Sequence, residues 1–128
     1  MNNVVALDSG AVLALAASER DAVTLIKGLA NGGAFFVVPA PVLTETLRGT
    51  PGTDVAINRV LKTLEAVPVS IEAAVAAGKN LGRTRSASTV DAMIIATAIE
   101  RGASAIVTGD PVDIAALSGG KLTIYKLY

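Results

Sequence analysis

Residues 4–10 of the chain are Val-Val-Ala-Leu-Asp-Ser-Gly, a short apolar run that ends at an acidic residue. An unbroken apolar run of this length is typical of a strand buried on both faces of a parallel sheet. Ser9 follows as the start of a helix. The stretch therefore predicts a buried strand that leads directly into a helix, the unit from which α/β folds are built.

The same alternation of strand and helix continues along the chain. Further strands are expected at residues 35–38, 67–69, 104–108 and 122–125. Apolar spacing and turn residues predict helices over residues 19–30, 41–48, 54–66, 70–81 and 90–99, and a short helix before residue 122. Residues 82–89 are expected to form a polar loop. The pattern predicts one domain over residues 1–128, an α/β/α sandwich around a mainly parallel central sheet.

Composition limits the classes of function. The 128 residues suffice for one core, and 52% of them are apolar against 17% charged, which predicts a large buried interior. Lys plus Arg number 11 and Asp plus Glu number 11, so the net charge is zero. No overall field attracts nucleic acid or an anionic membrane, and any nucleic-acid contact must be local.

Missing residue types exclude several chemistries. The chain has no Cys and no His, which rules out disulfides, thiolate or imidazole metal sites, and nucleophiles activated by histidine. It has no Trp, two Phe and two Tyr, too few for a base-stacking platform. No apolar stretch approaches the length of a membrane span, so we expect a cytoplasmic protein with no membrane contact. Carboxylates with hard cations remain for hydrolytic chemistry.

Four acidic residues are expected near the carboxyl-end edge of the sheet, where open α/β folds bind ligands. Asp8 follows the first strand, Asp110 comes two residues after the strand that ends at Thr108, Asp91 opens a buried helix, and Glu45 lies on the helix after the second strand. Convergence of their side chains would make a site for a hard cation.

Structural roles compete with this interpretation at Asp91 and Asp110. Asp91 stands three residues after Ser88, the spacing of a capping box, and a helix N-terminus favours negative charge. Asp110 precedes Pro111 and could cap a helix that carries Asp113 in its first turn. For these two residues both interpretations stay open.

For Glu45 and Asp8, structural and functional roles also have to be compared. Glu45 could be a surface residue paired with Arg48 at i+3. Asp8 has no basic residue within ten positions, and an acid in an apolar setting costs several kcal/mol to bury unless it is paired or binds a metal. The functional interpretation is therefore favoured at Asp8.

Taken in order, these motifs resemble the PIN-domain ribonucleases, and among them the VapC toxins of type II toxin–antitoxin systems. The matching segments are residues 7–11 (Leu-Asp-Ser-Gly-Ala), Glu45 after Val38-Pro39, residues 91–98 (Asp-Ala-Met-Ile-Ile-Ala-Thr-Ala) and residues 107–110 (Val-Thr-Gly-Asp). The resemblance covers essentially the whole chain. It implies an endoribonuclease dependent on Mg²⁺ or Mn²⁺, usually a homodimer, that a small cognate antitoxin holds inactive and that leaves 5′-phosphate and 3′-hydroxyl ends.

Carried over by position, the resemblance makes Asp8, Glu45, Asp91 and Asp110 the catalytic acids. Mg²⁺ binds oxygen ligands and is typically held by one or two carboxylates, and Asp8, Asp91 and Asp110 are expected to supply them. Glu45 would position water or bind a second ion.

Further residues are expected around these acids. Ser9 and Thr108 would support the carboxylates by hydrogen bonds, and Asp113 occupies a position where many relatives carry another acid. Arg83 and Arg85 are predicted to contact RNA phosphates. Two other functions remain open: RNA processing outside a toxin pair, and a non-catalytic module that binds RNA or protein.

Overall fold

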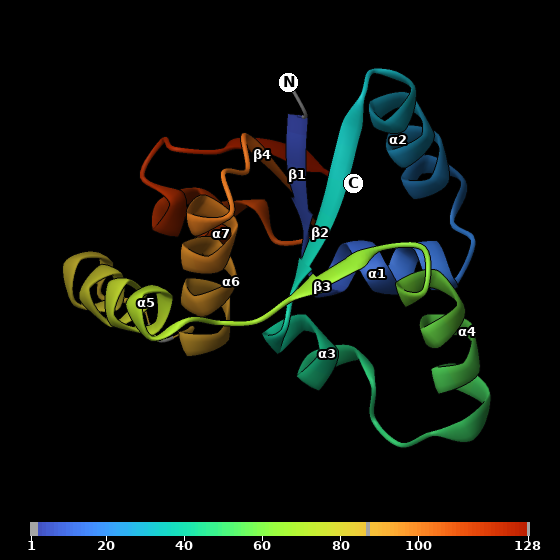
Figure 1. Cartoon of the computed structure of the whole chain (residues 1–128), viewed down its shortest axis with the longest axis horizontal. Helices are drawn as coiled ribbons and strands as arrows, with labels where there is room; N and C mark the ends of the chain where they lie inside the picture. Colours follow the sequence, from blue (N-terminus) through green and yellow to red (C-terminus); the bar gives the residue numbers. More distant parts are fainter. Residues whose placement is uncertain (1–2, 87, 128) are drawn as a thin grey trace.

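The computed structural model describes residues 3–86 and 88–127, which form strands that alternate with one or two helices (Figure 1). The strands are β1 (Asn3–Leu7), β2 (Ala34–Pro39), β3 (Glu65–Val67), β4 (Ala105–Thr108) and β5 (Thr123–Lys126). The helices are α1 (Ser9–Ala16), α2 (Arg20–Asn31), α3 (Pro41–Thr46), α4 (Pro51–Leu61), α5 (Ile71–Thr84), α6 (Thr89–Glu100) and α7 (Pro111–Ser118).

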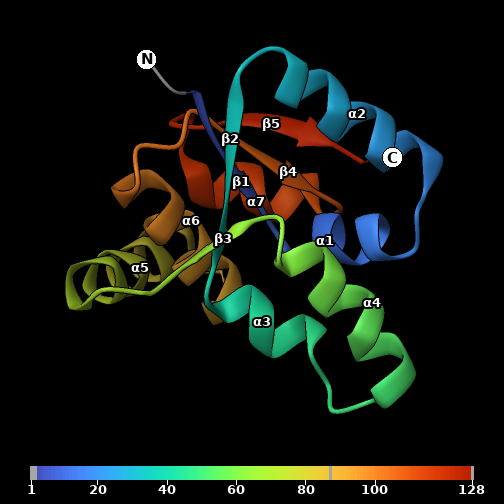
Figure 2. The ribbon, with the colours of Figure 1, turned by 45° about the vertical axis from the view of Figure 1, so that its right-hand side comes forward.

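All five strands form one parallel sheet in the order β3-β2-β1-β4-β5. The chain builds the sheet outward from β1 to β3, then crosses to the other side of β1 for β4 and β5. Helices α1, α2 and α4 lie on one face and α5, α6 and α7 on the other (Figures 1 and 2). The predicted α/β/α sandwich with a parallel central sheet is confirmed.

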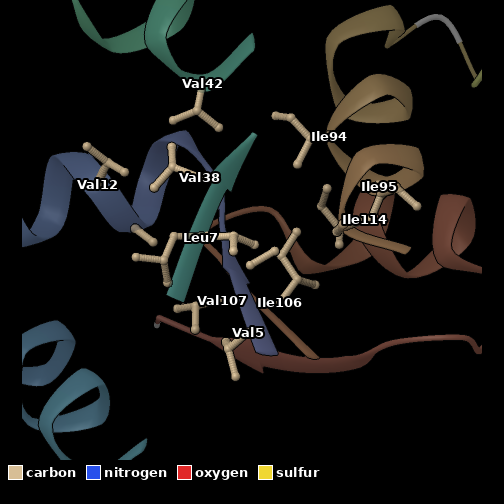
Figure 3. Close-up of a cluster of buried hydrophobic side chains, with 14 of the residues drawn as sticks. Val5, Leu7, Val12, Val38, Val42, Ile94, Ile95, Ile106, Val107 and Ile114 are labelled. Atoms are coloured by element: carbon tan, nitrogen blue, oxygen red, sulfur yellow. The ribbon is translucent and has the colours of Figure 1, made fainter. Parts of the chain in front are cut away.

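The core lies where the central strands meet α6 and α1 (Figure 3). Every residue of β4 is buried, as are Val5, Ala6 and Leu7 of β1. Helix α6 is apolar on nearly all sides and buries five of its twelve residues. The unbroken apolar runs of the sequence are therefore the centre of the fold, with apolar atoms on both faces of the sheet.

Helix α4 begins and ends earlier than the sequence suggests. It starts at Pro51, whose fixed φ suits a first helical turn, whereas residue 54 was expected. The carboxylate of Asp54 accepts hydrogen bonds from the amides of Arg48 (3.3 Å) and Gly49 (2.9 Å), which fastens the preceding turn. The helix ends at Leu61, before the expected residue 66. Strand β3 then begins beside β2 at Glu65, two residues before the strand that the sequence predicts.

Helix α5 ends later than expected. Residues 82–84 were predicted as loop but are helical, and the helix ends only where Arg85 adopts a left-handed conformation with φ of 58°. Gly82 therefore lies within the helix and does not end it. Tertiary contacts with α6 and α7 outweigh the low helix propensity of this glycine.

Thr97 in the middle of α6 is the one buried side chain, within the described part of the chain, whose hydroxyl has no hydrogen-bond partner. Thr97→Val keeps the shape and removes the unpaired hydroxyl, so we expect the free energy of unfolding to rise by about 1 kcal/mol. Thr46→Val is the matched control, because the buried Thr46 hydroxyl donates to the Val42 carbonyl at 2.8 Å. Urea unfolding of both variants measures the difference, and a loss of stability in Thr97→Val would contradict the expectation.

Within the described residues, no helix is both long and apolar enough to cross a membrane.

Candidate active site

The site lies where the sheet changes its direction of growth. Strands β1 and β4 are parallel neighbours, and the chain leaves them into α1 and α7 on opposite faces of the sheet. In open α/β sheets, ligands bind beyond the carboxyl ends of strands at such a switch point. Asp8 directly follows β1, and Asp110 follows β4 by two residues. The topology thus places two of the predicted acids at this edge.

Asp8 is buried, with 6% of its surface exposed, and it caps α1. Its carboxylate accepts a hydrogen bond from the amide of Ala11 at 3.1 Å and another from the hydroxyl of Thr108. Burial raises the pKa of this carboxyl above its usual value, the negative charge of Asp91 raises it further, and the hydrogen bonds oppose both effects. The helix cap is therefore Asp8, and Ser9 is the first helical residue.

Thr108 joins the ends of the two central strands. Its side chain is fully buried, and its hydroxyl oxygen accepts a hydrogen bond from the amide of Asp110 at 2.9 Å. The same hydroxyl bonds to the carboxylate of Asp8. Thr108 thus fixes the backbone that carries Asp110 relative to the side chain of Asp8, which is the supporting position expected from the sequence.

Asp91 stands in the first turn of α6, where its carboxylate Oδ2 accepts a hydrogen bond from the Ser88 hydroxyl at 2.7 Å. Ser88 makes no side-chain cap bond to the helix, so the capping box that the spacing allows is not formed. Burial raises the pKa of Asp91, and the negative charges of Glu45 and Asp110 raise it further. Ser88 was expected only as a cap, and its contact with Asp91 required the three-dimensional structure.

Asp113 joins Asp91 and Asp110 in the most compact acidic group. One ligand oxygen from each of the three carboxylates lies within 4.8 Å of the others. Asp113 is exposed, and its pKa is raised first by the charge of Asp110. Asp110 stands at the cap position of α7 without a side-chain cap bond. Its carboxylate therefore does not cap the helix, and it interacts instead with the side chain of Asp113.

The expected metal-binding group of Asp8, Asp91 and Asp110 differs from this compact group in one member. Asp8 lies outside the three carboxylates that share the 4.8 Å limit, and its link to them is the charge of Asp91. Asp113, one turn along α7 from Asp110, is the third member of the compact group.

Glu45 contacts the site from α3. It accepts a hydrogen bond from the hydroxyl of Ser9, and its charge raises the pKa of Asp91. The guanidinium of Arg48 donates instead to the carbonyl of Thr44 at 3.3 Å. The alternative of a surface pair between Glu45 and Arg48 is therefore wrong, and Ser9 supports a carboxylate as expected.

Arg83 and Arg85 do not enter the acidic group. Arg83 lies in the last turn of α5 and donates to Oδ1 of Asn80 at 2.5 Å, so its expected place in a loop is wrong. Within the described residues, the charges that shift the pKa values of Asp8, Asp91 and Asp113 are all negative.

Gly10 allows the two strand ends to approach. A Cβ atom at Gly10 would lie 3.2 Å from the amide nitrogen of Gly109 and 3.5 Å from Oδ1 of Asp8. The distance to Gly109 is shorter than normal packing allows, whereas the distance to Asp8 is an ordinary contact. Glycine thus lets the start of α1 pass the segment that carries Asp110. The sequence does not reveal this role, because the contact joins residues almost 100 positions apart.

These donors fit a hard divalent cation. The cluster offers carboxylate and hydroxyl oxygens, the ligands that Mg²⁺ and Mn²⁺ prefer, and the chain contains neither His nor Cys to favour softer metals. Mutual repulsion among the carboxylates also favours a bound cation: the charge of Asp110 is the main cause of the raised pKa of Asp113, and for Asp91 it adds to the effect of burial.

Known structures share this fold at low sequence identity. The toxin–antitoxin complex from Klebsiella pneumoniae has a chain with a TM-score of 0.78 and 17% identity, covering 97% of this chain and 98% of that one. VapBC2 from Rickettsia felis, solved with a promoter DNA fragment, also scores 0.78, at 16% identity over 96% and 98% of the two chains. VapC20 from Mycobacterium tuberculosis scores 0.60, at 20% identity over 80% and 86%.

No curated protein sequence matches the chain. The sequence profile of the PIN domain matches residues 5–117, which include the three acids of the compact group and also Asp8 and Glu45. The chain therefore belongs to the PIN domain family.

Proposed function

We propose that the chain is an endoribonuclease dependent on Mg²⁺ or Mn²⁺ that acts as the toxin of a toxin–antitoxin pair. The observation that carries this proposal is the compact group of Asp91, Asp110 and Asp113, with Asp8 and Glu45 beside it, at the switch point of a PIN domain. The titles of the similar structures support it: they name VapBC and toxin–antitoxin complexes, and VapC20 as a toxin that cleaves the sarcin–ricin loop.

The acidic residues have different proposed roles. Asp8, Asp91 and Asp110 are proposed to hold the cation with Asp113, which the compact group adds as a fourth donor. Ser88 fixes the rotamer of Asp91, and Thr108 fixes Asp8 relative to the segment of Asp110. Such supporting hydrogen bonds orient ligands, and their loss typically costs about 10- to 100-fold in metal affinity or activity.

The proposed reaction is hydrolysis of a phosphodiester bond. The chemistry supplied by the bound cation would be charge neutralisation on the scissile phosphate and activation of the attacking water. The water oxygen attacks phosphorus in line, the bond from phosphorus to the 3′ oxygen breaks, and the products are a 5′-phosphate and a 3′-hydroxyl. Glu45, whose Oε1 accepts a hydrogen bond from Ser9, would position the water and accept its proton at Oε2.

The proposed partners are RNA as substrate, a small cognate antitoxin as inhibitor, and a second copy of the chain in a homodimer. Among the described residues, the charges that shift the pKa values of Asp91 and Asp113 are all negative, so the site is a surface to which an antitoxin could present a positive group. The cytoplasm, where both RNA and an antitoxin would be met, is the proposed location.

The decisive experiment combines cleavage with growth. Purified protein is expected to cut single-stranded RNA in Mg²⁺ or Mn²⁺, to leave 5′-phosphate ends, and to lose cleavage in chelator. Induced expression should arrest growth, and co-expression of a small neighbouring gene should restore it. Glu45→Gln tests the site, and Glu65→Gln, an exposed acid on β3, is the matched control. Cleavage that persists in chelator would contradict metal dependence, and cleavage without growth arrest would place the enzyme outside a toxin pair.

A further inference from the structure

A cation-lined cavity lies away from the acidic site, between α5, α6 and the end of α7. It encloses about 410 Å³, and Lys79, Arg83 and Lys121 line it without any acidic side chain. Apolar side chains of α6, together with Ala76, Leu117 and the polar Asn80 and Ser118, line much of its wall. Three positive charges around one cavity, in a chain of zero net charge, make it a local site for an anion.

Hydrogen bonds fix part of this cavity in place. The guanidinium of Arg83 donates to Oδ1 of Asn80 at 2.5 Å, and the amide nitrogen of Asn80 donates to the carbonyl of Leu117 at 2.6 Å. Gly119 lines the same cavity in a left-handed conformation, and a Cβ atom there would lie 3.5 Å from a terminal nitrogen of Arg83. The cavity thus holds a guanidinium positioned between α5 and the end of α7.

A second cavity lies next to the acidic site. It measures about 490 Å³ and is lined by Thr84, Ser86, Ser88, Asp113 and Ala116. Ser88 and Asp113 belong to the acidic site, whereas Thr84 and Ala116 are chain neighbours of Arg83 and Leu117 in the first cavity. Residues of both α5 and α7 therefore line each cavity, the second towards the start of α7 and the first at its end.

The distance between the two ends suits a short length of nucleic acid. Helix α7 has eight residues and so spans roughly 12 Å. Asp110 and Asp113 lie at its N-terminal end, and Gly119 and Lys121 lie just beyond its C-terminal end. A strand cut at the acidic site would reach the cations within a few nucleotides.

We propose that the cavity of Lys79, Arg83 and Lys121 binds a backbone phosphate of the RNA substrate, with the strand running from the acidic site along α5 and α7. This inference rests on the proposed function. The acidic site repels a polyanion, so affinity for RNA has to come from cations outside it. An acidic protein segment would also suit the cations, but the second cavity, with its hydroxyl-bearing side chains beside Asp113, favours the substrate.

Binding in chelator tests the inference without cleavage. The triple variant Lys79→Ala, Arg83→Ala, Lys121→Ala is compared with Arg20→Ala, Lys27→Ala, Lys62→Ala, which removes the same charge from exposed positions on and beside α2 and α4, across the sheet. Fluorescence anisotropy with a labelled 20-nucleotide single-stranded RNA of mixed sequence gives the affinity at several salt concentrations. Loss of this phosphate contact should make the plot of log affinity against log salt shallower by about 0.7. If the two proteins bind equally at about 1 M salt, the cavity variant then binds roughly 4-fold more weakly at about 0.15 M.

Cleavage kinetics add a second readout. The cavity variant should raise KM far more than it lowers kcat, and the control variant should change neither. Equal salt slopes for the two variants, in a wild type that binds and cuts RNA, would overturn the inference and leave the proposed function intact. A wild type that neither binds nor cuts RNA would refute the proposed function itself. If the cavity variant loses affinity for poly-L-glutamate and keeps it for RNA, the cavity binds an acidic protein segment instead.

Discussion

Asp91→Asn is expected to abolish RNA cleavage and to leave the metal-free protein at least as stable as the wild type. Asp91 is one of the three carboxylates of the compact acidic group. Its loss should therefore lower the cleavage rate by more than the roughly 10- to 100-fold that is typical of a supporting residue. Burial and the charges of Glu45 and Asp110 disfavour its carboxylate, and the neutral amide removes both effects. The amide oxygen can still accept the hydrogen bond from Ser88.

Metal binding and pH supply independent readouts of the same change. A cation that binds only the folded state stabilises it by mass action, by about 2.7 kcal/mol at 100 times its dissociation constant, and Asp91→Asn should reduce this gain. Because the pKa of Asp91 is raised in the folded protein, its contribution to metal-free stability is greatest below pH 3.8 and falls as pH rises through the raised value. In Asp91→Asn, the stability of the metal-free protein should therefore decrease less with rising pH than in the wild type.

The opposite result would identify Asp91 as a helix-terminal charge. Loss of such a charge lowers the free energy of unfolding by several tenths to about 1 kcal/mol. Thermal melts in chelator and in Mn²⁺, together with a cleavage assay, separate the two roles. Asp21→Asn is the matched control, because Asp21 is an exposed acid in the first turn of α2. A variant that melts lower than the wild type and still cuts RNA would remove Asp91 from the site.

The sequence predicted the central architecture because the apolar runs are unambiguous. Residues 4–7 and 105–107 carry no polar side chain, and runs of this kind are stable only when both faces of the strand are covered. The ends of elements were less predictable, because they depend on contacts between distant segments. Helix α5 continues through Gly82 to Thr84, where it meets α7, a contact that local propensity does not encode.

Some features of the candidate site could also be predicted from the sequence, and others could not. The topology of a parallel sheet brings the ends of β1 and β4 together, so the positions of Asp8 and Asp110 could be predicted from their order after strands. Which carboxylates lie closest depends on rotamers and on the entry of α6 and α7. Asp113 therefore joined Asp91 and Asp110 only in the structure, and the hydroxyl of Ser88 proved to serve Asp91 and not the end of the helix.

Asp8 combines two roles that one substitution cannot separate. It is a buried N-cap that accepts from the amide of Ala11, and it is an acid whose pKa is affected by Asp91. An asparagine retains a side-chain oxygen for the cap and loses the negative charge, whereas an alanine loses both. A comparison of the two variants therefore measures the cap and the charge separately.

Both Asp8→Asn and Asp8→Ala are expected to lose RNA cleavage, and Asp8→Ala alone is expected to lose about 1–2 kcal/mol of stability as well. The asparagine variant should stay within about 0.5 kcal/mol of the wild type, because the lost hydrogen bond from Thr108 is offset by removal of a buried charge. Ser70→Ala is the matched control for capping: Ser70 caps α5 through the amide of Ala73 at 2.9 Å, so its loss should lower stability and spare cleavage. Urea unfolding and initial rates of RNA cleavage give both quantities for all three variants. If Asp8→Asn cut RNA at the wild-type rate, the negative charge at the end of β1 would have no part in the reaction, and Asp8 would be a helix cap alone.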